Sequence, residues 1–98
     1  MEVQTRYGIC KNVDLDHLEE YGGKGCYIFT DYILDNNNGS YLLFGFEIWE
    51  DEEDENKKFH FFVEEGFEDG SSDTYPAEIS SFDRDYIKKL YYEFIRNS

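Results

Sequence analysis

Carboxylate side chains are the most abundant reactive groups in this sequence, and their densest run is six successive acids from Glu50 to Glu55. Carboxylates this close together offer three kinds of chemistry. They bind divalent cations, they exchange protons, or they present negative charge to a cationic partner. The first two uses require a defined geometry around the acids, whereas the third requires only a concentration of charge.

A metal site is not supported by the spacing of the ligands. The segment 35–40 begins like a calcium-binding loop, but Gly39 comes one position early and Phe46 stands where a bidentate glutamate is needed. The run from Asp51 to Glu55 has ligands without a glycine turn, so we expect weak calcium association at most. Zinc spacing is absent from the histidines and cysteines, which are His17, His60, Cys10 and Cys26.

Catalytic motifs are also absent from the sequence. It contains no nucleophile elbow, no P-loop and no glycine-rich dinucleotide-binding motif. The two histidines and many acids leave room for a hidden acid–base pair, but crowded carboxylates without an apolar pocket around them are poor evidence for tuned catalysis. We therefore expect no catalytic residue, no cofactor and no enzymatic activity.

The negative charge is concentrated in one part of the chain. The 98 residues include 23 acids and 9 Lys or Arg, a formal net charge of −14. Residues 47–78 contain 13 acids and 2 lysines, a net charge of −11, whereas residues 79–98 have a net charge of +1. Such a field repels nucleic acids and anionic membranes and attracts cationic partners. The alternative is an acidic loop that is simply solvated.

Two features favour a binding role for this charge. The acidic run is internal, so folding forces its like charges together at an electrostatic cost. Carboxylates on alternate strand residues lie about 6.6 Å apart, and several such rows approximate the phosphate track of a nucleic acid, with one charge per ~1.7 Å of duplex. The predicted partner-binding residues are Glu47, Trp49, Glu50, Asp51, Glu52, Glu53, Asp54, Glu55, Glu64, Glu65, Glu68, Asp69 and Asp73.

Strands are predicted where aromatic and β-branched residues gather or alternate with polar ones. The most distinct pair is a β-hairpin around the turn residues Asn36–Gly39. In its second strand, the apolar residues Leu42, Phe44, Phe46 and Ile48 share a face and are expected in the core. Trp49 lies on the opposite face with Tyr41, Leu43, Gly45 and Glu47. The predicted strands are Glu2–Cys10, Cys26–Asp35, Tyr41–Glu50 and Phe59–Glu65, and Gly66–Ala77 is expected to be irregular.

Two helices complete the predicted fold. A short one starts at Asn12 or Asp14 and ends before Gly22-Gly23. A longer one starts with Ser80 as its N-cap, and its apolar stripe consists of Phe82, Tyr86, Ile87, Leu90, Tyr91, Phe94 and Ile95. The prediction is one compact α+β domain, residues 1–98, with the order β-α-β-β-β-α. About four antiparallel strands pack against the C-terminal helix.

The cellular setting is inferred from sequence features. The N-terminus lacks the basic and apolar regions of a signal peptide, and no apolar run approaches the ~20 residues that span a bilayer. Cys10 and Cys26 are expected to be small buried hydrophobes in a reducing cytosol. We expect a soluble protein of the bacterial cytoplasm.

In size, acidic patch and aromatic content, the chain resembles the phage and mobile-element inhibitors of bacterial defence nucleases, including DNA-mimicking anti-CRISPR and anti-restriction proteins. The resemblance implies a stoichiometric inhibitor in which residues 47–73 block the cationic DNA- or RNA-binding surface of a nuclease such as a CRISPR effector. One alternative is an immunity protein or antitoxin that caps a basic toxin nuclease. Another is a homo-oligomeric structural or regulatory domain that dimerises through an aromatic sheet face.

Overall fold

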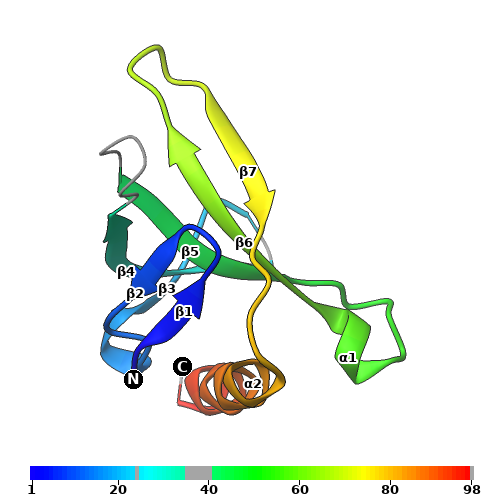
Figure 1. Cartoon of the computed structure of the whole chain (residues 1–98). Helices are drawn as coiled ribbons and strands as arrows, with labels where there is room; N and C mark the ends of the chain where they lie inside the picture. The colour runs from blue at the N-terminus through cyan, green and yellow to red at the C-terminus, as the bar shows by residue number, and fades with distance from the viewer. Residues whose placement is uncertain (24, 35–40, 98) are drawn as a thin grey trace.

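A computed structural model describes residues 1–23, 25–34 and 41–97 of the chain. In this part of the chain, an antiparallel sheet has five strands in the order β3-β4-β5-β6-β7, and a two-stranded hairpin lies beside it (Figure 1). One C-terminal helix, α2, packs on the sheet, so the predicted α+β class is confirmed. The strands are β1 Val3–Thr5, β2 Gly8–Cys10, β3 Leu18–Glu20, β4 Cys26–Leu34, β5 Tyr41–Ile48, β6 Phe59–Gly66 and β7 Ser72–Pro76. The helices are the 3₁₀ turn η1 Leu15–His17, α1 Glu55–Lys58 and α2 Ser81–Arg96.

The core lies on one face of the sheet. Its centre is aromatic, because β4, β5 and β6 place phenylalanines opposite one another, with Phe44 between Phe29 and Val63. Helix α2 and the β1–β2 hairpin both cover this face, since residues of both belong to the same buried cluster. The predicted core residues of β5 are at most 5% exposed, and they are Leu42, Phe44, Phe46 and Ile48.

The second face of the sheet has a row of residues across its three central strands. Ile28, Gly45 and Phe62 are cross-strand neighbours in this row. A Cβ atom at Gly45 would clash with the carbonyl oxygen of Tyr27 and would lie 3.0 Å from both flanking side chains. Glycine is therefore required at this position, and the neighbouring side chains cover it. Solvent reaches the second face, because Glu47 on it is exposed.

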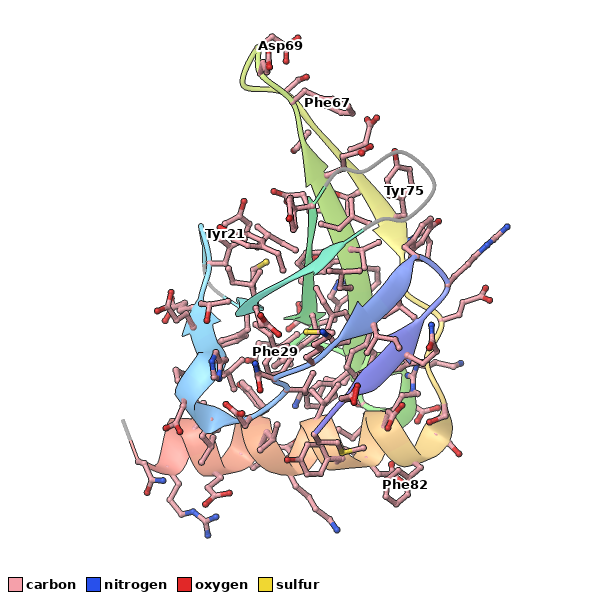
Figure 2. All side chains as sticks on the ribbon, turned by 60° about the vertical axis from the view of Figure 1, so that its left-hand side comes forward. Tyr21, Phe29, Phe67, Asp69, Tyr75 and Phe82 are labelled. Carbon is pink, nitrogen blue, oxygen red and sulfur yellow. The ribbon has the colours of Figure 1, made fainter. Side chains whose placement is uncertain are left out.

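Helix α2 begins as the sequence predicts, with the Ser80 side chain accepting a 3.1 Å hydrogen bond from the Asp83 amide. The predicted apolar stripe is only partly buried. Ile87, Leu90 and Tyr91 lie in the core, whereas Phe82 is 72% exposed in the first turn. Figure 2 shows Phe82 on the side of the helix away from the sheet. Ile95 in the last turn is also exposed, whereas Tyr86 and Phe94 are partly buried against the core.

The predicted single strand Glu2–Cys10 is wrong, because the segment folds back as the β1–β2 hairpin. Val3 pairs with Cys10, and Thr5 pairs with Gly8. The Thr5 hydroxyl closes the turn by donating to the Gly8 carbonyl at 2.8 Å and accepting from the Tyr7 amide at 3.1 Å. Alternation of side chains continues through this tight turn, so the sequence pattern looks like one strand.

The predicted helix between Asn12 and Gly22 is also wrong. Only the 3₁₀ turn Leu15–His17 forms, with the Asp14 side chain accepting from the His17 amide at 3.1 Å. The chain then becomes β3, an edge strand in which Leu18 pairs with Phe29 of β4. Pairing with the long central hairpin therefore outweighs the weak helical pattern of a segment with few apolar residues.

The segment predicted to be irregular, Gly66–Ala77, contains β7, which is the fifth strand of the sheet. Its polar residues lack the alternation that identifies a half-buried strand, because β7 is an edge strand. The hairpin Cys26–Asp35/Tyr41–Glu50 is confirmed as β4 and β5, with an irregular register between Phe29 and Ile33. Its predicted turn, Asn36–Gly39, lies outside the described residues. Within the described ranges, no helix is long and apolar enough to cross a membrane.

Candidate functional site

The predicted acidic residues lie in two groups at opposite ends of β6 (Figure 1). The first group, here called the loop acids, precedes or begins α1. The second group, here called the hairpin acids, lies on β6, on β7 and in the turn between them. Strand β6 spans seven residue steps, about 23 Å at a rise of about 3.3 Å per residue. The loop acids are Glu50, Asp51, Glu52, Glu53, Asp54 and Glu55, and the hairpin acids are Glu64, Glu65, Glu68, Asp69 and Asp73.

The two groups are therefore separated by β6 and do not form one continuous acidic surface. Glu47 lies apart from both, on the second face of the sheet, where it pairs with Cys26 and His60. The predicted strand Phe59–Glu65 is consistent with this separation, because it lies between the two acidic segments in the chain. The position of Asp73 opposite Glu65 could not be predicted, because it depends on the pairing of β6 with β7.

The β6–β7 hairpin projects from the body of the molecule, with Phe67 and Asp69 at its tip (Figure 2). The chain from Phe59 to Asp83 contains no Lys or Arg. Strand pairing places Glu65 directly opposite Asp73, an arrangement of like charges that destabilises a sheet. Such departures from the local rules of stability are found most often at functional sites.

The tip of the hairpin is an ordered turn. The Phe67 amide donates to the Ser71 carbonyl at 2.9 Å, and Gly70 adopts a positive φ of 87°. Asp69 accepts hydrogen bonds from the amide and the hydroxyl of Ser71, at 2.9 and 2.6 Å. These bonds lower the pKa of Asp69, so its carboxylate stays ionised. The exposed Phe67 ring lies beside this charge.

Tyrosine hydroxyl groups orient several of the acids. Tyr21 donates to Glu64 at 2.6 Å, and this bond raises the pKa of Tyr21. Tyr92 of α2 lies 3.1 Å from a carboxylate oxygen of Glu55. The Tyr75 hydroxyl lies 3.5 Å from both carboxylates of the Glu65–Asp73 pair.

The pKa values of the other two tyrosines are also raised, by burial first and then by these carboxylates. All three phenols thus remain neutral donors at physiological pH. A phenol fixes the direction of a carboxylate without cancelling its charge. The acids at these positions are therefore both oriented and negative.

These tyrosines were not among the predicted site residues. One of them had a recognisable signal, because Tyr92 lies outside the predicted apolar stripe of its helix. The other two have no such signal, since their carboxylate partners become neighbours only when the sheet forms.

The loop acids are held by a compact turn. The Glu52 amide donates to the Trp49 carbonyl at 3.1 Å, and the Glu52 carboxylate accepts from the Asp54 amide at 3.2 Å. Two lysine amides, those of Lys57 and Lys58, donate to the Asp54 carbonyl. Five of the six acids precede α1: Glu50 and Asp51 lie in a turn, and the next three have no regular secondary structure. Five of the six are exposed. The turn thus presents most of this charge to solvent.

Trp49 is 51% exposed, in agreement with its predicted position on the second face of the sheet. Its ring stacks on His60 with centroids 3.8 Å apart. A hollow of about 570 Å³ lies beside this stacked pair and is also lined by Glu52, Lys57 and Arg84. The aromatic surface is therefore adjacent to the loop acids, where it can contribute to an interface.

The described histidines and cysteines have local structural contacts. His17 lies 2.7 Å from Asp14, which raises the pKa of the imidazole. Cys10 is buried as predicted, and burial raises its pKa to about 12. Cys26 is half-buried, and both thiols are free. In the described part of the chain, no three His, Cys, Asp or Glu side chains come together in a way that holds a metal ion. The segment 35–40, which begins like a calcium-binding loop, lies outside the described residues.

Comparisons of the chain with protein-family models, with curated proteins and with solved structures found no match. Functional inference therefore rests on the arrangement of the residues themselves.

Proposed function

We propose that the protein is a non-enzymatic inhibitor that places its hairpin acids and loop acids on the cationic nucleic-acid-binding surface of another protein. The observation that carries this proposal is the orientation of carboxylates by neutral hydroxyl donors, as in the pairs Tyr21–Glu64 and Tyr92–Glu55. Acids fixed in this way need little further ordering when they meet a partner, so less conformational entropy is lost on binding.

The spacing of the two acidic groups supports a groove as the target. Strand β6, which follows the loop acids and carries Glu64 and Glu65 near its far end, is about 23 Å long, which corresponds to about seven base pairs at 3.4 Å per step of a nucleic-acid strand. A protein groove built for a duplex has Lys and Arg residues along that length. The two acidic groups would occupy its ends, while the tip residue Phe67 and Trp49 supply exposed aromatic surface of the kind that bases offer.

The class of target follows from the same chemistry. A nuclease binds its substrate through cationic side chains, and occupation of those side chains prevents entry of DNA or RNA. We propose a bacterial defence nuclease, such as a CRISPR effector, as the target. Long-range attraction between the acidic protein and such a surface would speed association by about tenfold or more at low salt.

A homodimer through the second face of the sheet has less support. That face carries Glu47 and Glu64 next to its apolar row. A symmetric dimer through this face would gather the carboxylates of both copies in one interface, which costs electrostatic energy. Four of the large aromatic residues of β5 and β6 lie in the core instead: Phe44, Phe46, Phe59 and Phe61.

Two charge-reversed variants and a matched control test the proposal. The first carries Glu52→Lys, Glu53→Lys and Asp54→Lys, and the second carries Glu68→Lys, Asp69→Lys and Asp73→Lys. The control changes three exposed acids elsewhere: Glu2→Lys, Asp85→Lys and Glu93→Lys. Each variant raises the formal net charge from −14 to −8, so only the position of the charge differs.

The measurement is capture of a partner from bacterial lysate at low and high salt, followed by competition with DNA or RNA for that partner. Wild-type protein should displace nucleic acid stoichiometrically, and each test variant should associate about tenfold more slowly, with the control close to wild type. The proposal would be contradicted if the test variants associated as fast as wild type at every salt concentration. It would also be contradicted if the control variant associated as slowly as the test variants. A captured toxin nuclease, in place of a defence nuclease, would assign the same mechanism to an immunity protein.

A further inference from the structure

A second cavity, whose lining includes none of the loop or hairpin acids, lies between the β1–β2 hairpin and strands β4 and β5. Its volume is about 560 Å³, within the range of ligand-binding pockets. Strand β2 packs against β4 beside it (Figure 1). Ile9, Lys11, Asp31, Tyr32 and Tyr41 are among the residues that line it.

Two exposed aromatic rings form one side of this cavity. Tyr32 is 58% exposed and Tyr41 is 64% exposed. Their ring centroids lie 6.4 Å apart, with an angle of 66° between the ring planes. The rings therefore present two surfaces that meet at a steep angle. Cations bind over the faces of such rings through the aromatic quadrupole.

The carboxylate of Asp31 adds a negative charge to the same cavity. Its Oδ2 atom accepts a 3.2 Å hydrogen bond from the Asn12 amide group, and its backbone carbonyl accepts from the Cys10 thiol at 3.4 Å. These contacts hold Asp31 in place without neutralising it. Among the described residues, Lys11 forms no ion pair with Asp31, although both line the cavity.

We propose that this cavity binds an arginine side chain of a protein partner. A guanidinium group is planar, so it stacks on a tyrosine ring while its N–H groups donate to a carboxylate. The aliphatic part of the side chain would contact Ile9, whose exposed apolar surface lies in the same cavity. The net charge of −14 attracts such a cation from a distance. This site is independent of the proposed function, because it uses none of the loop or hairpin acids.

Lys11 distinguishes a cationic ligand from an anionic one. Its ammonium group repels a guanidinium in the same cavity, so its removal should strengthen binding. An anionic or zwitterionic ligand would instead use Lys11, and its removal would weaken binding. Removal of the Asp31 charge should have the opposite effect and weaken the binding of a cation.

The test is a titration of ¹⁵N-labelled full-length protein with N-acetyl-arginine amide, followed through the backbone amide shifts of Tyr32 and Tyr41. N-acetyl-citrulline amide, which has nearly the same shape without the charge, is the control ligand. Wild type should bind the arginine derivative saturably, with a dissociation constant on the order of 1 mM. Asp31→Asn should weaken binding by about tenfold, the usual effect of losing a charged acceptor.

Matched variants separate local effects from a change in overall charge. Asp85→Asn and Lys89→Ala, both on exposed positions of α2, should leave the affinity unchanged. Lys11→Ala should strengthen binding about twofold or more. Tyr32→Ala should weaken binding while the protein stays folded, because the Tyr32 ring is exposed. The proposal is overturned by equal binding of the citrulline derivative, by absence of saturable shifts, or by weaker binding of the Lys11→Ala variant.

Discussion

The Tyr21 hydroxyl donates a 2.6 Å hydrogen bond to Oε1 of Glu64, which lies 43 positions further along the chain. Tyr21 directly follows the edge strand β3, whereas Glu64 is on β6, and β4 and β5 lie between these strands. The bond thus connects two separated strands across the second face of the sheet. It also fixes the first of the hairpin acids at the base of the projecting hairpin.

Replacement of Tyr21 by Phe should lower the free energy of unfolding by about 1 kcal/mol, the usual net value of one hydrogen bond. The ring remains, so the loss reports the hydroxyl alone. Urea denaturation at neutral pH measures it. Tyr41→Phe is the matched control, because the Tyr41 hydroxyl has no hydrogen-bond partner in the described part of the chain. Equal stability of the two variants would show that the Tyr21–Glu64 bond contributes nothing.

Stability should fall in alkaline solution. Burial raises the pKa of Tyr91 to about 12, from the ordinary value of 10.0. Such a group binds its proton more tightly in the folded state, so its contribution is complete below pH 10 and is lost as the pH rises through 12. The pKa of Tyr21 is raised in the same direction by its bond to Glu64.

The free energy of unfolding, measured in urea between pH 8 and 11, should therefore decrease above pH 10 in wild type. The decrease should be shallower in Tyr91→Phe, whatever the stability of that variant at neutral pH, because one titrating phenol has been removed. A free energy that stays constant to pH 11 would contradict the prediction.

The parts of the fold that the sequence predicts correctly are those that local chemistry decides. The alternation of Phe44, Phe46 and Ile48 identifies the buried face of β5 without reference to any neighbour. The Ser80 side chain caps α2 through a hydrogen bond to an amide three residues away. Long-range pairing decides the other elements. The polar segment Ser72–Pro76 becomes a strand only because β6 provides a partner for it.

The candidate site was predictable only in part for the same reason. The concentration of charge in residues 47–78 is visible in the sequence. The predicted strand Phe59–Glu65 also separates the loop acids from the later ones, but the position of Asp73 opposite Glu65 depends on β7, which the sequence does not predict. The carboxylate partners of the tyrosine donors cannot be identified from the sequence, even for Tyr92, which stands outside the predicted apolar stripe. Tyr92 and Glu55 are 37 positions apart and meet only where α2 passes α1.

Gly45→Ala should destabilise the fold by about 1–3 kcal/mol, the usual effect of overpacking a closely packed site. The added methyl group would collide with the Tyr27 carbonyl oxygen, and β4 cannot move away without disturbing its pairing with β5. Gly66→Ala is the control, since a Cβ atom there meets nothing within 4 Å. Thermal and urea denaturation of both variants test the prediction. A Gly45→Ala variant as stable as Gly66→Ala would mean that β5 can shift to accept a side chain.

Trp49→Ala should affect binding more than stability. The ring is half-exposed and stacks on His60 alone among the described aromatic residues, so its loss should reduce the free energy of unfolding by less than about 1 kcal/mol. If Trp49 is an anchor of the interface, the same change should weaken binding of the captured partner by about 2 kcal/mol or more. Isothermal titration with that partner and urea denaturation measure the two effects on the same protein. Equal losses of binding and stability would instead assign the ring to packing of the sheet.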